Sequence, residues 1–129
     1  MIIGIGCDIV NIERITPENQ FLNNFQRRIL GTEEIAELSL KNISNQQRAS
    51  LLAKYYAAKE AFAKALGTGF RNGLYLKDIQ VLHDDLGKPL LKLSNQAELL
   101  LKNLHPAAKT HISISDDFPY AQAFVIIEN

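Results

Sequence analysis

The strongest structural signal in the sequence is a long helical pattern that runs from Asn45 to Leu66. Apolar side chains recur along it at helical spacing and mark one stripe, made of Leu51, Tyr55, Phe62 and Leu66. Gly67 and Gly69 follow directly, and glycine is the residue that most often ends a helix. Another element can pack closely against this helix, because it carries small alanine residues at positions 57, 58, 61, 63 and 65. Whatever else the chain forms must therefore cover this one helix.

The N-terminal segment, residues 2 to 10, alternates in the manner of a strand. One face carries Ile3, Ile5, Cys7 and Ile9, and the other carries Gly4, Gly6 and Asp8. Because glycine has no side chain, the second face leaves room beside Asp8 for a ligand or for another backbone. Cys7 shares the isoleucine face, so we expect it to be a small core residue rather than a nucleophile.

Shorter elements are predicted on both sides of the long helix. Helix starts are expected at Thr16-Pro17-Glu18 and, after Gly31, at Thr32-Glu33-Glu34. Strand-like runs at 78–83 and 90–93, separated by turn residues, predict a hairpin. A helix is predicted at 95–104, before Pro106, and strands at 111–115 and 121–127. This order favours an α+β fold in which a mainly antiparallel sheet packs against the long helix.

Composition limits what the chain is expected to be. Its 129 residues suit one compact domain, residues 1–129, and are too few for two comfortable ones. Apolar residues make up 47%, and 14 basic residues balance 14 acidic ones, so no nucleic-acid partner is expected. No apolar run is long enough for a membrane helix, and the single cysteine cannot form an internal disulfide. Together with the absence of a signal-peptide pattern, this predicts a cytoplasmic protein.

Two carboxylates are candidates for chemistry. Asp8 ends its strand beside the glycines, where it is either a ligand or a cap for the next turn. Glu60 shares a helical stripe with Tyr56 and Lys64, and a glutamate four residues before a lysine is commonly an ordinary surface pair. The alanines around Glu60 favour the other interpretation, a crowded and buried site.

Other polar groups carry weaker signals. His111, Ser113 and Ser115 share one face of a strand, which fits either contacts to phosphate or an ordinary half-exposed strand. Gly67-Thr68-Gly69 can cradle a phosphate, but a helix C-cap explains Gly67 equally well. His83 and His105 have no companions at metal-ligand spacing and are interpreted as surface histidines.

Taken together, these segments resemble the small bacterial 4′-phosphopantetheinyl transferase family. The matching blocks, in the family's order, are Gly4–Val10 with Arg14-Ile15, Phe25–Leu30 with Glu34, Ala58–Gly69, and His111–Ser115. Asp78-Ile79 and Gly87-Lys88-Pro89 of the predicted hairpin fit as well. The resemblance spans nearly the whole chain. It implies the family's fold, a homotrimer with active sites between subunits, coenzyme A as donor and Mg²⁺ as cofactor.

The resemblance also implies roles for single residues. Asp8 and Glu60 match the family's metal-binding carboxylates, which suits Mg²⁺ because this ion is usually held by one or two carboxylates together with phosphates and water. Lys64 matches a residue at the coenzyme A phosphates and counts with them as catalytic. His111 resembles the family's contact to the 3′-phosphate. Gly87 and Pro89 fall where the adenine end binds, and Gly67 is assigned to the same cofactor.

The implied reaction is the transfer of 4′-phosphopantetheine to a serine of an apo acyl carrier protein, for fatty acid biosynthesis. The serine attacks the β-phosphorus of coenzyme A and 3′,5′-adenosine diphosphate leaves, so positioning and electrostatics do most of the catalysis. Glu60 and a metal-bound water are both compatible with the role of base. A module that binds coenzyme A or a carrier protein without catalysis, and a purely structural oligomer, are the rival interpretations.

Arg14 and Arg28 resemble residues that meet the acidic carrier protein. The alternative is that each pairs with a nearby carboxylate, such as Glu13 or Glu34, and holds its own helix in place. Two positions depart from the family pattern: Tyr55, with Lys54 before it, stands where a basic residue is frequent, and Asp116 stands where histidine is frequent. Both departures remove positive charge, so contacts to the nucleotide phosphates are expected to be weaker or rearranged.

Overall fold

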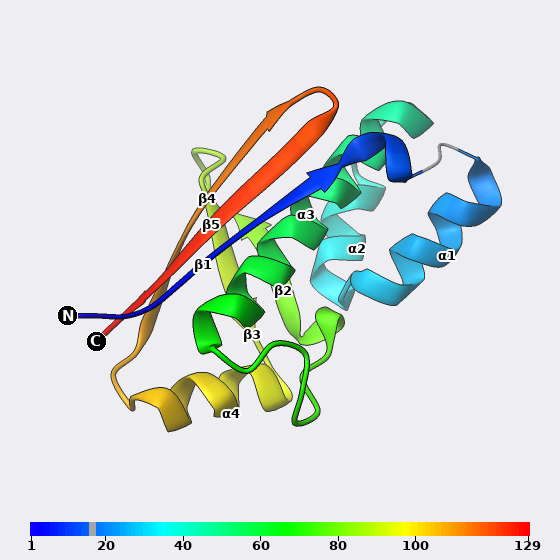
Figure 1. The fold of residues 1–129 in the computed structure, drawn as a ribbon. Coiled ribbons are helices and arrows are strands. Elements are labelled where there is room, and N and C mark those ends of the chain that lie inside the picture. The colour runs from blue at the N-terminus through cyan, green and yellow to red at the C-terminus, as the bar shows by residue number, and fades with distance from the viewer. Residues whose placement is uncertain (16–17) are drawn as a thin grey trace.

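The computed structural model describes residues 1–15 and 18–129, so the helix start predicted at Thr16 and Pro17 lies outside the described residues. Figure 1 shows the arrangement of the elements. In chain order these are β1 (Ile2–Asn11), the 3-10 turn η1 (Ile12–Arg14), α1 (Asn19–Ile29), α2 (Thr32–Ser39), α3 (Asn45–Leu66), the 3-10 turn η2 (Leu76–Asp78), β2 (Ile79–His83), β3 (Pro89–Leu93), α4 (Asn95–Leu104), β4 (Lys109–Asp117) and β5 (Tyr120–Glu128).

The strands of the described residues form two antiparallel sheets. The larger sheet has the order β1-β5-β4, with β5 in the centre, and β2 and β3 form the predicted hairpin. The hairpin lies next to β4, so both sheets lie around α3 (Figure 1). The α+β class and the antiparallel pairing are confirmed. The structure adds that these strands form two separate sheets, which the sequence does not predict because strand patterns alone do not say which strands pair.

Helix α3 packs on one face of β1 and β5, and the glycines of β1 are the reason it comes so close. We call this the inner face of the larger sheet; on β1 it carries Gly4, Gly6 and Asp8. A Cβ atom on Gly4 would lie 2.2 Å from the carbonyl oxygen of Ala65, and one on Gly6 would lie 1.9 Å from that of Ala61. The space that the glycines leave is therefore filled by the backbone of α3, the second of the two predicted occupants.

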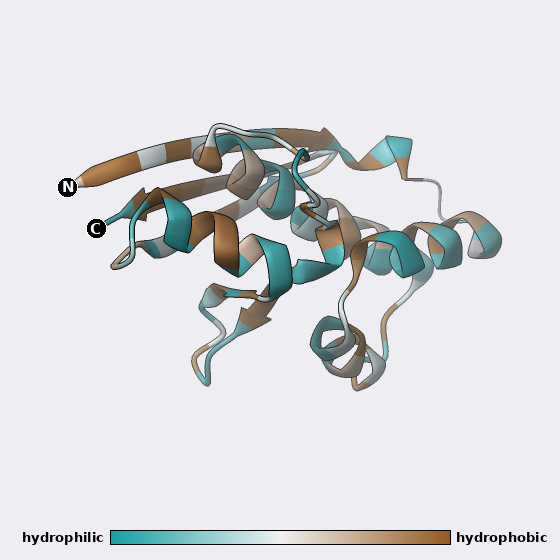
Figure 2. Ribbon diagram, turned by 90° about the horizontal axis from the view of Figure 1, so that it is seen from below, coloured by the Kyte–Doolittle hydropathy of each residue, from teal (hydrophilic) through white to brown (hydrophobic). Residues whose placement is uncertain are grey.

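The outer face of the larger sheet is apolar and uncovered. Ile5 and Ile9 are 63% and 60% exposed, and Phe124 of β5, which lies opposite Cys7, is 45% exposed. Figure 2 shows the hydrophobic residues along β1. Cys7 is exposed on this face, so the prediction that it is a core residue is wrong. Alternation predicts which residues share a face, but the glycines determine which face the helix can approach.

The hydrophobic core lies between α3 and the elements around it. It includes Leu22 and Ile29 of α1, Phe62 of α3, Val81 of β2 and Val125 of β5, each fully buried. Gly67 ends α3 in the left-handed conformation at φ 82°, so its predicted role as a helix C-cap is confirmed. No helix among the described residues is long and apolar enough to cross a membrane.

Candidate active site

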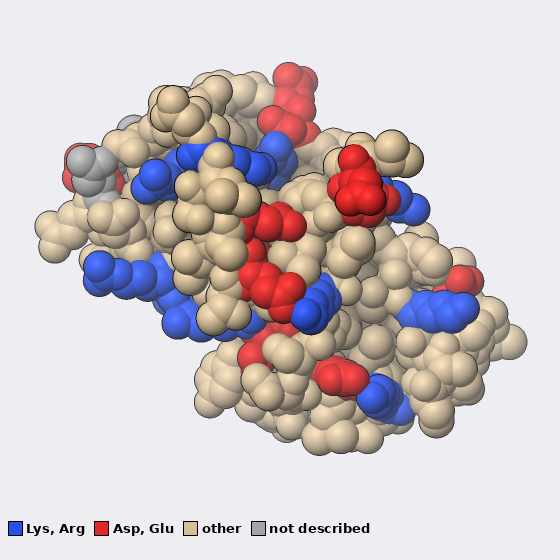
Figure 3. Space-filling model, turned by 180° about the vertical axis from the view of Figure 1, so that it is seen from behind, with Lys and Arg blue, Asp and Glu red and all other residues tan. Residues whose placement is uncertain are grey.

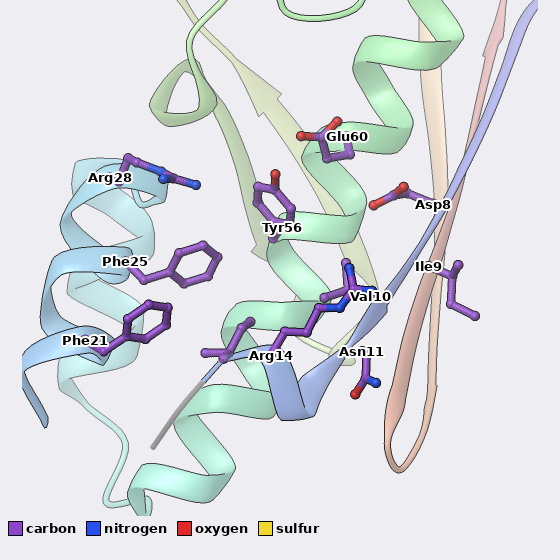
Figure 4. Close-up of a pocket in the computed structure, with 11 residues that line it drawn as sticks. Asp8, Ile9, Val10, Asn11, Arg14, Phe21, Phe25, Arg28, Tyr56 and Glu60 are labelled. Atoms are coloured by element: carbon purple, nitrogen blue, oxygen red, sulfur yellow. The ribbon is translucent and has the colours of Figure 1, made fainter. Parts of the chain in front are cut away.

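Asp8 and Glu60 lie at one pocket although they are far apart in sequence. Asp8 comes from the inner face of β1 and Glu60 from the middle of α3, next to Ala61, which the glycine contact holds against β1. Both line a cavity of about 420 Å³. Figure 4 shows the two carboxylates on its β1 and α3 sides. Glu60 was predicted to lie in a crowded and buried site; α3 does approach β1 closely at Ala61, but Glu60 itself is half-buried.

The opposite side of this cavity is aromatic and basic. Phe21 and Phe25 project from α1, and the Phe25 ring lies 5.6 Å from that of Tyr56 on α3. The Arg28 guanidinium lies over Phe25 at 5.6 Å from the ring centroid, a cation–π arrangement. Arg14 lines the same cavity from η1, directly after β1 (Figure 4). The structure therefore brings Asp8, Glu60, Arg14 and Arg28 together around one cavity.

Lys64 joins this cluster through Asp8 rather than through Glu60. Its Nζ donates to Asp8 Oδ1 and to the carbonyl oxygen of Cys7, both at 2.9 Å. The hydrogen bond to Asp8 holds the pKa of Lys64 above its ordinary value. The interpretation of Glu60 and Lys64 as an ordinary surface pair is therefore wrong, because the ion pair of Lys64 is with a strand carboxylate that only the fold brings near.

Tyr56 is the residue of the cavity that the sequence reasoning placed but did not interpret. Burial, and then the neighbouring Glu60 carboxylate, raises the pKa of its phenol. Its position one helical turn before Glu60 was the available signal, since residues four apart share a helix face. The sequence does not single out Phe21, because nothing in its spacing distinguishes an aromatic residue that lines a cavity from one that packs in the core.

Asp8 and Glu60 have the donor chemistry that Mg²⁺ prefers. Among the described residues there is no group of three or more His, Cys, Asp or Glu side chains that could hold a metal by itself. Mg²⁺ is commonly bound by one or two carboxylates and completed by substrate phosphates and water. The two carboxylates and the ammonium of Lys64 beside them thus suit a magnesium-bound pyrophosphate.

Gly87 and Pro89 lie away from these carboxylates, at the opposite edge of the larger sheet. They line a smaller cavity of about 180 Å³ together with residues of α3, β2 and β4, among them Tyr55, His83 and Asp116. In the sheet, Asp8 aligns with Ala123 of the central strand and Ala123 with Ile114 of β4, so β1 and β4 form opposite edges. The predicted adenine site and the predicted metal site are therefore separated by the width of the sheet.

The two departures from the family pattern meet at this second cavity. Lys54 Nζ lies 3.6 Å from Asp116 Oδ1, so the lysine is paired with the acidic residue that stands in place of histidine. Tyr55 is buried, and its burial and then the charge of Glu37 raise the pKa of its phenol. Lys54, the basic residue next to Tyr55, is thus paired with Asp116, the residue at the other departure.

His111 lies on the outer face of the larger sheet, across from the carboxylates. Residues aligned across neighbouring strands point to the same face of a sheet, and His111 aligns with Ile126, which aligns with Ile5 of the outer face. Asp8 belongs to the inner face of β1. The Nε2 of His111 lies 2.8 Å from Glu128 Oε1. Gly67 is at the exposed end of α3, one turn after Lys64. In a single chain, the residues predicted to bind coenzyme A therefore lie in three different places: beside Asp8 and Glu60, at the β4 edge of the sheet, and on its outer face.

Comparison with known proteins gives a consistent result. Residues 4–123 match the model of the 4′-phosphopantetheinyl transferase superfamily. The chain is 45% identical to the holo-[acyl-carrier-protein] synthase of Zymomonas mobilis, over 99% of this chain and 97% of that one. It is similar to the crystal structure of the Neisseria meningitidis synthase, with a TM-score of 0.84 and 38% identity over the full length of both chains. It is also similar to the Bacillus anthracis synthase in complex with CoA (3′,5′-ADP), with a TM-score of 0.77, 35% identity, and coverage of 98% and 96%.

Proposed function

The chain belongs to the 4′-phosphopantetheinyl transferase superfamily, and we propose that it transfers 4′-phosphopantetheine from coenzyme A to a serine of an apo acyl carrier protein. The observation that supports this most directly is the convergence of Asp8, Glu60 and Lys64 beside a cavity that Arg14 and Arg28 also line. The modified carrier then serves fatty acid biosynthesis. It stays a prediction that the chain forms a single domain and that it acts in the cytoplasm.

In the proposed reaction the serine oxygen forms a bond to the β-phosphorus of coenzyme A, and its hydroxyl proton passes to a base, either the Glu60 carboxylate or a water molecule. The bond from that phosphorus to the oxygen bridging to the α-phosphorus breaks, and 3′,5′-adenosine diphosphate leaves with the electron pair. Asp8 and Glu60 would hold Mg²⁺, which would neutralise the pyrophosphate oxygens and the charge that develops on them. Lys64, which donates to Asp8, would bring an ammonium close to the same oxygens.

A direct assay tests the proposal. The chain is incubated with apo carrier protein, coenzyme A and Mg²⁺, and the mass of the carrier is followed together with the release of 3′,5′-adenosine diphosphate. We expect a mass gain of one phosphopantetheine, absent when a chelator removes the metal. Binding of coenzyme A with neither product would instead favour a non-catalytic binding module, and no binding at all would favour a structural oligomer.

We further propose that the active form is a homotrimer with sites between subunits. Two features support this: the predicted coenzyme A residues of one chain face different directions, and the outer sheet face leaves Ile5, Ile9 and Phe124 exposed. Contiguous exposed apolar residues of this kind are typical of a protein interface. With subunits packed through the outer face, His111 of one subunit can reach a neighbour's site.

Charge placed on the outer face is expected to separate the subunits. In Phe124→Asp, the new carboxylate would be buried unpaired at the interface, so we expect a monomer that no longer binds coenzyme A. Light scattering gives the mass and isothermal titration gives the binding. Leu99→Asp, at an apolar residue of α4 that is 51% exposed, is the matched control and should stay trimeric. A monomer that still binds coenzyme A tightly would contradict the intersubunit site.

Arg14 and Arg28 are proposed to contact the carrier protein. Glu34, the predicted alternative partner of Arg28, is instead buried against Lys59, and among the described residues neither arginine forms an ion pair. Lys and Arg side chains also gather on the side of the molecule that carries α1 (Figure 3). A chain of zero net charge needs such a local patch to attract an acidic partner.

Reversal of these charges should affect one substrate only. We expect Arg14→Glu and Arg28→Glu each to raise KM for the carrier protein about tenfold and to weaken its salt dependence, since charges at the edge of an interface act mainly on association. KM for coenzyme A should stay within about twofold in both. Arg27→Glu is the control from the same helical turn, because Arg27 is exposed and does not line the cavity. Equal losses for both substrates would place the arginines at the nucleotide instead.

A further inference from the structure

A fully buried ion pair, Lys59 with Glu34, lies next to Glu60 on α3. Lys59 and Glu34 both have 0% exposed side chains, and Lys59 Nζ lies 2.7 Å from Glu34 Oε1. Burial lowers the pKa of Lys59 and raises that of Glu34, and each partner opposes the shift of the other. Such a pair is costly to bury, and well-packed apolar residues of similar volume would give equal or greater stability in many proteins. Stability alone therefore does not explain why the pair is present.

All three donors of the Lys59 ammonium and both oxygens of the Glu34 carboxylate form hydrogen bonds. The Lys59 ammonium donates to Glu34 Oε1 and to the carbonyl oxygens of Leu76 and Ile79, at 2.7, 3.0 and 2.7 Å. The Glu34 carboxylate also accepts from the backbone N–H of Gly31 through Oε1 and of Val81 through Oε2, both at 2.9 Å. An ammonium has three protons to donate, so Lys59 has no spare donor.

These contacts tie together the segments that carry the two sides of the site. Lys59 directly precedes Glu60 on α3, and Gly31 follows Arg28 by three residues at the end of α1. Leu76 lines a cavity of about 560 Å³ that also includes Arg28 and Glu60 and so adjoins the first one. The buried pair thus fixes α3, the α1–α2 junction and η2 relative to one another at the point where the two cavities meet.

We propose that Lys59 and Glu34 are positioning residues for Glu60, holding its carboxylate in a fixed place between Asp8 and Arg28, with which it lines the cavity. The proposal rests on the function proposed above. An ion pair whose ammonium has no spare donor and whose two carboxylate oxygens both accept is restricted to few arrangements, whereas an apolar pair of similar volume tolerates more rotation and sliding of the helix. A shift of about 1 Å in such a site can cost on the order of 10²-fold in rate.

The test variant is the double substitution Glu34→Gln with Lys59→Met. Removing one partner alone would leave an uncompensated buried charge and a poorly folded protein, which the double variant avoids. Leu101→Ala, in the buried face of α4, is the control, because it removes core packing without touching the cavities. Thermal melting verifies that all proteins are folded, and kinetics are measured well below the midpoint.

Two readouts separate positioning from mere destabilisation. We expect the double variant to lose at least about tenfold in kcat with little change in KM for coenzyme A, and Leu101→Ala to keep kcat within about twofold. The second readout needs no activity: 3-fluorotyrosine is incorporated, and the ¹⁹F chemical shift of Tyr56, assigned with Tyr56→Phe, is measured at one fixed pH. Because Tyr56 lies beside Glu60 in the same cavity, this chemical shift should change in the double variant and stay unchanged in Leu101→Ala.

An unchanged ¹⁹F chemical shift of Tyr56 in the double variant would overturn the proposal, and so would a kcat within twofold of the parent protein. Failure of the proposed function is distinguishable from either outcome, since the parent protein would then show no transfer while the Tyr56 chemical shift would still report on the position of Glu60.

Discussion

Asp8→Asn and Glu60→Gln are each expected to lower kcat by about 100-fold or more, which corresponds to roughly 2.7 kcal/mol of lost transition-state stabilisation. The two carboxylates line the same cavity from different elements, and Mg²⁺ needs both because the remaining ligands come from phosphates and water. Loss of either one therefore removes most of the contribution of the ion. The rate of the carrier's mass gain is the measurement, at saturating coenzyme A and several Mg²⁺ concentrations.

The double variant gives the decisive comparison. If both side chains hold one ion, Asp8→Asn with Glu60→Gln should be little slower than either single variant, because groups that act as a unit are not additive. Losses that multiply to about 10⁴-fold would contradict a shared ion. Glu98→Gln serves as the control, since Glu98 is exposed on α4 and pairs only with Lys102 at 2.7 Å. It should leave both the rate and the Mg²⁺ dependence unchanged.

Gly6→Ala is expected to destabilise the protein by about 3 kcal/mol or more, at or beyond the upper end of overpacking costs. Its Cβ would lie 1.9 Å from the carbonyl oxygen of Ala61 and 2.7 Å from the amide nitrogen of Ala65. These are backbone atoms of a helix, which cannot move aside as a side chain can. The melting temperature should fall by roughly 10 °C or more, if the variant folds at all.

An exposed residue on another element provides the control for this prediction. Asn103→Ala changes an exposed side chain of α4 and should leave the melting temperature nearly unchanged. Gly4→Ala, whose Cβ would lie 2.2 Å from the Ala65 oxygen, should behave like Gly6→Ala. A Gly6→Ala protein that melts with the parent would mean that α3 does not approach β1 as closely as the structure has it.

Much of the local structure is predictable because it depends on neighbouring residues. The long helix begins at Asn45 and ends at Leu66 as predicted, since its N-terminal cap and Gly67 are both local signals. The hairpin and the helix at 95–104 follow for the same reason. The strands predicted at 111–115 and 121–127 were shorter than β4 and β5, because pairing extends a strand beyond its apolar residues.

The sequence by itself determined that Gly4, Gly6 and Asp8 share a face, because a strand alternates with a period of two whatever surrounds it. It also placed Tyr56, Glu60 and Lys64 on one stripe, because helical spacing is equally local. The tertiary structure alone decided that the glycine face is the covered one, that Lys64 pairs with Asp8, and that Cys7 and His111 lie on the outer face. The reason is physical: local patterns repeat along one element, whereas partners separated by some fifty residues or more are selected by which faces can pack with the smallest gap.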